Sequence, residues 1–263
     1  DEVAHTGCVR NLMTRKGFKS GELMVVLVTL GEALPFEAEL LAALRDLPIT
    51  TLVQNINDER TNRILGTSNR VLLGEGVIRD KIHELAFEIS PLSFFQNNPS
   101  QTDVLYSKAL EYSELTGNET VFDIYCGIGT ISLFLAGKAA KVVGIESVES
   151  AISDARRNAD LNGIEHTEFH VGKAEQLMPE LHAQGVTADV VVMDPPRKGC
   201  DKAVLQTLVG MAPRRLVYVS CNPQTLARDL AWLVKQGFVL DEVQPVDMFP
   251  HSMHVEAVAR LSL

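Results

Sequence analysis

Short apolar runs alternate with amphipathic stretches of helical period from Glu119 onward. The predicted strands are Thr120–Tyr125, Lys141–Glu146, Glu168–Val171, Ala188–Asp194, Arg215–Ser220, Val239–Val246 and Val255–Leu261. The predicted helices between them include Val148–Asn162, Lys202–Met211 and Gln224–Gln236. Near-continuous apolar strands separated by helices are typical of a mostly parallel sheet covered on both faces. The pattern therefore predicts an α/β domain over residues 91–263.

Residues 1–90 follow a different pattern, which predicts a small α+β domain. Its elements are expected at Leu23–Leu30 (strand), Phe36–Leu47 (helix), Thr50–Ile56 (strand) and Arg70–Ile89 (two or three short strands). The short apolar runs and the single helical stretch are each bounded by turn residues. Ser90–Asn98 is predicted as a loop, and a helix through Val104–Glu114 leads into the α/β domain.

Length and composition are those of a soluble globular protein. The chain has 263 residues, of which 46% are hydrophobic and 22% charged. The longest apolar run near the start, Leu23–Leu30, is too short to cross a membrane as a helix. No export leader opens the sequence, so we expect a cytoplasmic protein. Because the chain begins with Asp1 and has no structural preamble, we expect it to be a fragment of a longer protein.

The net charge is 24 − 34 = −10, which on its own argues against a nucleic-acid partner. The basic clusters are Arg15-Lys16 with Lys19, Arg79 with Lys81, Arg197-Lys198, and Arg214-Arg215. Each cluster taken singly is typical of a solvated surface. An RNA-binding domain outside this sequence would reconcile the acidic balance with an RNA substrate.

The four cysteines, Cys8, Cys126, Cys200 and Cys221, are widely spread. None are paired at the spacing of a zinc or local iron–sulfur site, so no metal is expected. Free thiols fit a reducing compartment. Burial as a small inert side chain is the default interpretation of Cys8 and Cys200, and Cys126 is interpreted as a packing residue.

A nucleoside-binding pattern follows the first strand of the α/β domain. Gly127 and Gly129 allow a tight turn and close approach of a ligand, and Glu146 ends the next strand, where it can accept bonds from ribose hydroxyls. Ser132 stands where a dinucleotide fingerprint has its third glycine. This favours a phosphate-free nucleoside over NAD, although an NAD-dependent enzyme remains the competing interpretation.

Candidate chemistry lies at the ends of two further strands. Asp194 precedes two prolines that stiffen the strand exit. Cys221 is followed by Asn222 and Pro223, a good N-cap and a good first helical residue. We expect the helix N-terminus to lower the pKa of the Cys221 thiol and favour a nucleophilic thiolate.

The sequence resembles the RNA 5-methyluridine (uridine-C5) methyltransferases, the TrmA and RumA family. The matching segments are Ser93–Asn98, Asp123–Gly129, Asp194–Gly199, Ser220–Pro223, Asp247–His251 and Val255–Glu256. The resemblance implies a Rossmann-like fold with a seven-stranded, mostly parallel sheet, S-adenosyl-L-methionine as cofactor and RNA as substrate. The kinship is closest to bacterial enzymes that act on 23S ribosomal RNA. The family's N-terminal RNA-binding domain and its optional iron–sulfur cysteines are absent from this sequence.

The same resemblance implies a role for each matched residue. Cys221 matches the nucleophile that adds to C6 of uracil, and Glu256 matches the general base. Gln96, Tyr125, Glu146 and Asp194, together with Gly127 of the glycine turn, are expected to line the cofactor pocket. Gln96 and Asp194 are also expected to help orient the uracil.

Three alternatives stay open at this point. The substrate could be tRNA, or the enzyme could be a non-covalent amino-group or small-molecule methyltransferase. The latter enzymes usually carry an aromatic residue after the two prolines, where Arg197 stands here. A non-catalytic cofactor-binding or RNA-scaffold module is the third. Phe94 and Phe95 are expected to pack between the two domains rather than to stack on a base.

Overall fold

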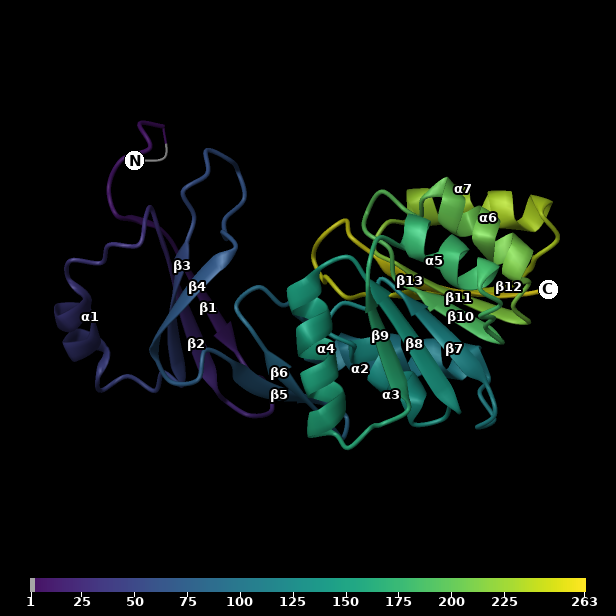
Figure 1. Cartoon of the computed structure of the whole chain (residues 1–263), viewed down its shortest axis with the longest axis horizontal. Coiled ribbons are helices and arrows are strands. Elements are labelled where there is room, and N and C mark those ends of the chain that lie inside the picture. Colours follow the sequence, from purple (N-terminus) through teal and green to yellow (C-terminus); the bar gives the residue numbers. More distant parts are fainter. Residues whose placement is uncertain (1–2) are drawn as a thin grey trace. The chain divides into compact units, whose positions relative to one another are not determined.

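The computed structural model describes residues 3–263 and divides the chain into two compact units, with the boundary between Ser93 and Phe94 (Figure 1). Each unit has its own sheet. None of the helices in the described part of the chain has both the length and the apolar content needed to span a bilayer.

The first unit is built on a four-stranded sheet with the order β1-β2-β3-β4. Its elements are β1 (Val9–Lys16), β2 (Leu23–Thr29), α1 (Glu37–Leu44), β3 (Thr51–Ile56), β4 (Ser68–Leu73), and a hairpin of β5 (Ile78–Ile82) and β6 (Leu85–Ile89). Strands β2 and β3 run parallel and are connected through α1, whereas β1 and β4 pair antiparallel to them. The small α+β architecture expected for this region is therefore present.

Two elements differ from the sequence-based expectation. Strand β1 was not expected, because it has no continuous apolar run and its residues are alternately exposed and partly buried. Helix α2 (Pro99–Ser113) begins before the expected Val104. The Asn98 side chain caps it by accepting a hydrogen bond from the backbone N–H of Gln101, and Pro99 occupies the first turn. That cap and proline are readable in the sequence and were missed.

The second unit contains a seven-stranded sheet with the order β12-β13-β11-β10-β7-β8-β9. The strands are β7 (Thr120–Ile124), β8 (Lys141–Glu146), β9 (Thr167–Val171), β10 (Val190–Met193), β11 (Arg215–Ser220), β12 (Val239–Val246) and β13 (Glu256–Ser262). Strands β11, β10, β7, β8 and β9 are parallel, and β13 pairs antiparallel with both β11 and β12. The expected α/β fold with a mostly parallel sheet is confirmed, and an antiparallel hairpin of β12 and β13 closes the sheet.

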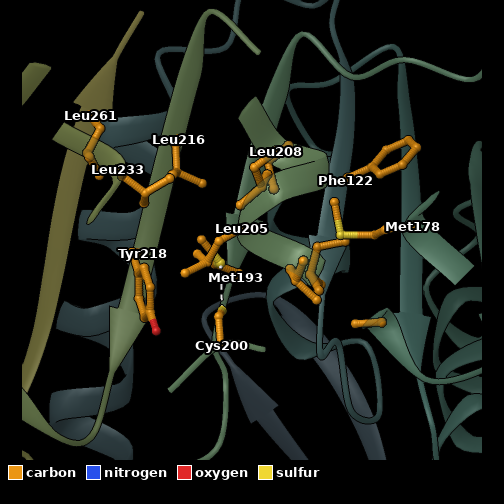
Figure 2. Close-up of a cluster of buried hydrophobic side chains, with 14 of the residues drawn as sticks. Phe122, Met178, Met193, Cys200, Leu205, Leu208, Leu216, Tyr218, Leu233 and Leu261 are labelled. Atoms are coloured by element: carbon orange, nitrogen blue, oxygen red, sulfur yellow. Dashed lines mark hydrogen bonds between the residues drawn. The ribbon is translucent and has the colours of Figure 1, made fainter. Parts of the chain in front are cut away.

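Helices cover both faces of this sheet (Figure 1). They are α2, α3 (Thr130–Ala136) and α4 (Glu149–Leu161) on one face, and α5 (Ala174–Ala183), α6 (Lys202–Met211) and α7 (Pro223–Lys235) on the other. The core under α5, α6 and α7 is apolar and fully buried, with Leu205, Leu208 and Leu233 of the helices packed on Leu216 and Tyr218 of β11 (Figure 2). Burial of this kind, at about 25 cal/mol per Å² of apolar surface, holds the strands in place.

Candidate active site

The register of the parallel strands sets side chains in a row at the carboxyl edge of the sheet. Met193 of β10 pairs with Ile124 of β7, and Ile124 pairs with Ile145 of β8. The next residue on each strand continues the row, because the N–H of Asp194 donates to the Ile124 carbonyl and the N–H of Tyr125 donates to the Ile145 carbonyl. Asp194, Tyr125 and Glu146 are therefore neighbours along one edge.

The antiparallel pair β11 and β13 extends this edge. Ser220 at the end of β11 pairs with Ala257 near the start of β13. Cys221 follows Ser220 and Glu256 precedes Ala257, so the antiparallel pairing sets Cys221 and Glu256 opposite each other. The hairpin that closes the sheet brings a residue close to the chain's end beside the strand-end cysteine.

A cavity of about 700 Å³ opens at this edge, within the second unit. Every site residue predicted from the sequence lines it: Gln96, Tyr125, Gly127, Glu146, Asp194, Cys221 and Glu256. Its other lining residues include Phe94, Ser147, Lys173, Glu175, Pro195 and Arg197. Lys173 and Glu175, which follow β9, were not predicted from the sequence. Their position after a parallel strand is the signal that could have indicated them.

The nucleoside end of the cavity is formed by Gly127 and Glu146. Gly127 has φ +55°, and a Cβ placed there would meet nothing within 4 Å, so the turn leaves open space. One carboxylate oxygen of Glu146 accepts from the Gly127 N–H at 3.3 Å, and the other accepts from the Val148 N–H at 2.9 Å. The half-buried Glu146 carboxylate lines the cavity beside an open glycine turn, which suits the two ribose hydroxyls of a nucleoside. The residues present fit an adenosine-bearing cofactor.

Gln96 and Asp194 supply polar groups to the same cavity. Gln96 is only 8% exposed, and it lines the cavity. An amide on a cavity wall can both donate and accept hydrogen bonds. Burial raises the pKa of Asp194 to about 6. Both side chains are therefore available to a ligand that donates and accepts hydrogen bonds.

The expected lowering of the Cys221 pKa is wrong for this structure. The pKa of the Cys221 thiol is raised, first by desolvation and then by the negative charges of Glu256 and Asp194. The positive charge of Arg197 acts in the opposite direction. Helix α7 does begin at Pro223 with Asn222 as its cap, as the sequence predicts, but desolvation and two nearby carboxylates raise the pKa of the Cys221 thiol.

Glu256 shares this environment. Its side chain is 3% exposed, and burial together with the charge of Asp194 raises its pKa to about 7. Arg197 again partly offsets the effect. A carboxylate with a pKa near neutrality is suited to accept and release a proton at physiological pH. Although it lies on a strand near the end of the chain, Glu256 does not face solvent.

The loop that carries Asp194 and Arg197 is fixed to the first turns of α7. The Arg197 carbonyl accepts hydrogen bonds from the Asn222 side-chain amide at 3.0 Å and from the Thr225 hydroxyl at 3.2 Å. The N–H of Cys200 donates to the buried Asp229 at 2.9 Å. These bonds hold the Asp194 loop against the helix that follows Cys221.

The other cysteines and the aromatic residues are placed as follows. Cys126 and Cys200 are buried, and burial raises the pKa of both thiols, that of Cys200 to about 12. The Cys200 thiol contacts the Met193 sulfur at 3.3 Å (Figure 2). Cys8 is only partly buried, and its thiol donates to the Ala33 carbonyl. Phe94 is 70% exposed within its own unit and lines the cavity.

Comparison with known proteins assigns a family to this chain. The profile of the tRNA (Uracil-5-)-methyltransferase family matches residues 50–262. The chain is 55% identical over 265 residues to an uncharacterized RNA methyltransferase of Halalkalibacterium halodurans, covering 100% of this chain and 58% of that protein. It is 52% identical over 264 residues to an uncharacterized RNA methyltransferase of Listeria innocua, again covering 100% of this chain and 58% of the relative.

Solved structures agree with this class. The crystal structure of Pyrococcus abyssi tRNA (uracil-54, C5)-methyltransferase in complex with S-adenosyl-L-homocysteine superposes with a TM-score of 0.82 and 33% identity. The match covers 97% of this chain and 60% of that one. The chain belongs to the tRNA (Uracil-5-)-methyltransferase family, whose fold is that of S-adenosylmethionine-dependent methyltransferases. It spans about three fifths of the length of these relatives.

Proposed function

We propose that the protein methylates C5 of a uridine in RNA, with Cys221 as covalent nucleophile and Glu256 as general base. The observation that carries the proposal is the opposition of Cys221 and Glu256 across β11 and β13, in a cavity that also holds the glycine turn and Glu146. A thiol and a base with a pKa near neutrality are the two protein groups that this chemistry needs.

The need for a nucleophile follows from the substrate. C5 of uracil is a weak nucleophile, and addition of the Cys221 thiolate to C6 creates an S–C6 bond and an enolate with electron density at C5. S-adenosylmethionine supplies the methyl group that C5 takes. Glu256 then removes the proton from C5. The electrons of that C–H bond re-form the C5=C6 double bond and expel the Cys221 thiolate, so the enzyme is regenerated.

The remaining residues position the reactants. Glu146 and Gly127 would hold the ribose of the cofactor, and Tyr125 would line the same subsite. Gln96, which lines the cavity, would pair with a polar edge of the uracil or with the methionine end of the cofactor. Arg197 opposes the carboxylates that disfavour the thiolate, and so favours the ionised form of Cys221. The target base must leave any stacked helix to reach the sulfur.

For the RNA class, we propose 23S ribosomal RNA, on the resemblance of the motifs to bacterial ribosomal enzymes. Transfer RNA is the alternative, and it is supported by the Pyrococcus abyssi relative, whose name gives uracil-54 of tRNA as its target. Both RNAs present the same base and sugar to the cavity, so the position of the methylated uridine decides between them.

The test is nucleotide-resolution mapping of 5-methyluridine in 23S ribosomal RNA and in tRNA. It compares cells that lack the protein with cells complemented by the wild type, Cys221→Ala or Cys8→Ala. Loss of one mark in 23S ribosomal RNA, restored by the wild type and Cys8→Ala but not by Cys221→Ala, is expected. Restoration by Cys221→Ala would remove the covalent mechanism and favour a non-covalent methyltransferase. A mark lost only from tRNA would reassign the substrate.

A further inference from the structure

A second cavity, of about 460 Å³, lies beside the first in the same unit. It is lined by residues 198–202, by Leu205 of α6, and by Arg228, Asp229 and Trp232 of α7. Lys198 and Asp201 line both cavities, so the second continues the first along the loop that follows Asp194. Its volume is within the range of small-ligand sites, about 300–1,000 Å³.

The lysines of this second cavity are not neutralised by the protein. Lys198 and Lys202 are exposed, and neither forms an ion pair with any carboxylate in the described part of the chain. Elsewhere in the unit Arg215 and Arg260 each contact several carboxylates. In a chain with net charge −10, this cavity wall carries two ammonium groups that no carboxylate of the described residues pairs with. They remain available to an external anion.

The position of Lys202 is unfavourable for the stability of helix α6. It is the first residue of α6, where the partial positive charge of the helix N-terminus repels a cation. Asp201 caps that helix, and its carboxylate accepts the Ala203 N–H at 2.8 Å. An anion held by Lys202 would gain from both the ammonium and the helix end.

The far wall is formed by Arg228 and Trp232. The Arg228 guanidinium is held in place, because its Nε donates to Asp229 at 2.8 Å and Nη2 donates to the Lys198 carbonyl at 2.9 Å. Asp229 is 2% exposed and pairs with Arg228, so the carboxylate adds little net negative charge to the cavity. Trp232 is the only tryptophan in the chain, and it is only partly buried. Nucleic-acid bases stack on aromatic rings, and nearby cations strengthen their binding. Trp232 supplies the ring, and Arg228 and the two lysines supply the cations.

We infer that this second cavity binds the nucleotide adjacent to the target uridine, with its phosphate at Lys198 and Lys202 and its base against Trp232. The inference rests on the proposed RNA substrate and extends it to the strand that flanks the methylated base. The two cavities share a wall, so a strand whose target base enters the first passes the second. The unpaired lysines supply the charge that binding of a phosphodiester needs despite the acidic balance of the chain.

The single tryptophan provides a direct test. Titration of the 263-residue chain with pentauridylate is expected to change Trp232 fluorescence saturably, whereas uridine 5′-monophosphate, which fills only the first cavity, leaves it nearly unchanged. Lys202→Ala is expected to weaken pentauridylate binding about fivefold and to lower the slope of log K against log salt by about 0.7. Lys138→Ala is the matched control, because Lys138 is exposed and lies before β8, at the opposite edge of the sheet.

Absence of a saturable fluorescence change, or equal weakening by Lys202→Ala and Lys138→Ala, would overturn the inference. Circular dichroism of the Lys202→Ala protein checks that the exposed substitution leaves the fold intact. The proposed function fails separately, because it is read from 5-methyluridine formation and its dependence on Cys221. Methylation that persists without the Trp232 signal would remove the second cavity alone.

Discussion

Cys221 and Glu256 lie opposite each other because β11 and β13 are antiparallel and their register aligns Ser220 with Ala257. The negative charge of Glu256 is one cause of the raised pKa of the Cys221 thiol. Ionisation of one group therefore disfavours ionisation of the other. The positive charge of Arg197 lowers the pKa of both groups and so acts against this effect. When the Cys221 thiolate adds to a substrate, the sulfur loses its negative charge, and its repulsion with the Glu256 carboxylate would be relieved.

Glu256→Gln is expected to separate the two halves of the reaction. The amide cannot take the C5 proton, so turnover falls about 10²- to 10⁴-fold while the Cys221 adduct still forms. Denaturing gels with labelled RNA should show a protein–RNA species that Cys221→Ala does not form. Glu165→Gln, at an exposed position outside the cavity, should neither slow turnover nor trap RNA. Release at the wild-type rate from Glu256→Gln would assign the base elsewhere.

The pH dependence of kcat/KM follows from the same two groups. Glu256 must be ionised to act as a base, and its pKa is about 7. The thiol of Cys221 must also lose its proton, and its pKa is raised. We expect kcat/KM to rise with pH through neutrality and to keep rising into the alkaline range. A rate that is flat between about pH 6 and 9 would be inconsistent with both assignments.

Glu256 should also make folding stability depend on pH. Its folded pKa of about 7 lies above the unfolded value, so the native state binds the proton more tightly. Its stabilising contribution is fully present below the unfolded pKa, near 4, and is lost as pH rises through 7. From pH 5 to pH 8, the free energy of unfolding of the wild type should fall by about 2 kcal/mol more than that of Glu256→Gln, because the glutamine does not titrate. Urea unfolding of both proteins at the two pH values measures the difference.

Glu146 is expected to control cofactor affinity. Charge-assisted hydrogen bonds of a carboxylate contribute about 1.5–3 kcal/mol, so Glu146→Ala should weaken binding of S-adenosylhomocysteine by at least about tenfold. Calorimetric titration gives the dissociation constant. Glu149→Ala, three residues further along at an exposed position in the first turn of α4, is the control. Equal effects of the two substitutions would mean that the Glu146 carboxylate does not contact the ligand.

Substitution of Gly199 tests the hydrogen bonds that hold the Asp194 loop on α7. It has φ +79°, and an added Cβ would lie 2.4 Å from Arg228 Nη2 and 2.6 Å from Asp229 Oδ2. Gly199→Ala should therefore destabilise the fold by more than the roughly 1 kcal/mol of a left-handed alanine, and should also lower kcat. Gly185→Ala isolates the backbone cost, since Gly185 has φ +83° and a Cβ added there would meet nothing within 4 Å. Thermal unfolding and kcat of the two variants should differ.

The sequence predicts the second unit well because its central strands β7, β8, β10 and β11 are largely buried and are short, mostly apolar runs. The carboxyl ends of parallel strands lie at the same edge of a sheet, so these runs alone predict that Glu146, Asp194 and Cys221 lie at one edge. Strand β1 could not be predicted in this way, because its residues are only partly buried and include Arg10, Arg15 and Lys16.

The raised pKa of the Cys221 thiol marks the limit of local reasoning. The sequence shows the helix that follows Cys221, but not the carboxylate of Glu256 that the antiparallel hairpin brings beside it. Burial and the long-range pairing between β11 and β13 decide the sign. Lys173 and Glu175 were missed for a simpler reason, since they follow a short strand with no motif to draw attention to them.

Covalent attachment of Cys221 to the base can be observed directly. RNA that carries 5-fluorouridine at the target position cannot lose the C5 substituent as a proton, so the adduct should persist after methyl transfer. Peptide mapping of the trapped complex by mass spectrometry should place the nucleotide on the peptide that contains Cys221. A nucleotide on another residue, or complete methylation of ordinary RNA with no adduct from the fluorinated RNA, would show that Cys221 is not the nucleophile.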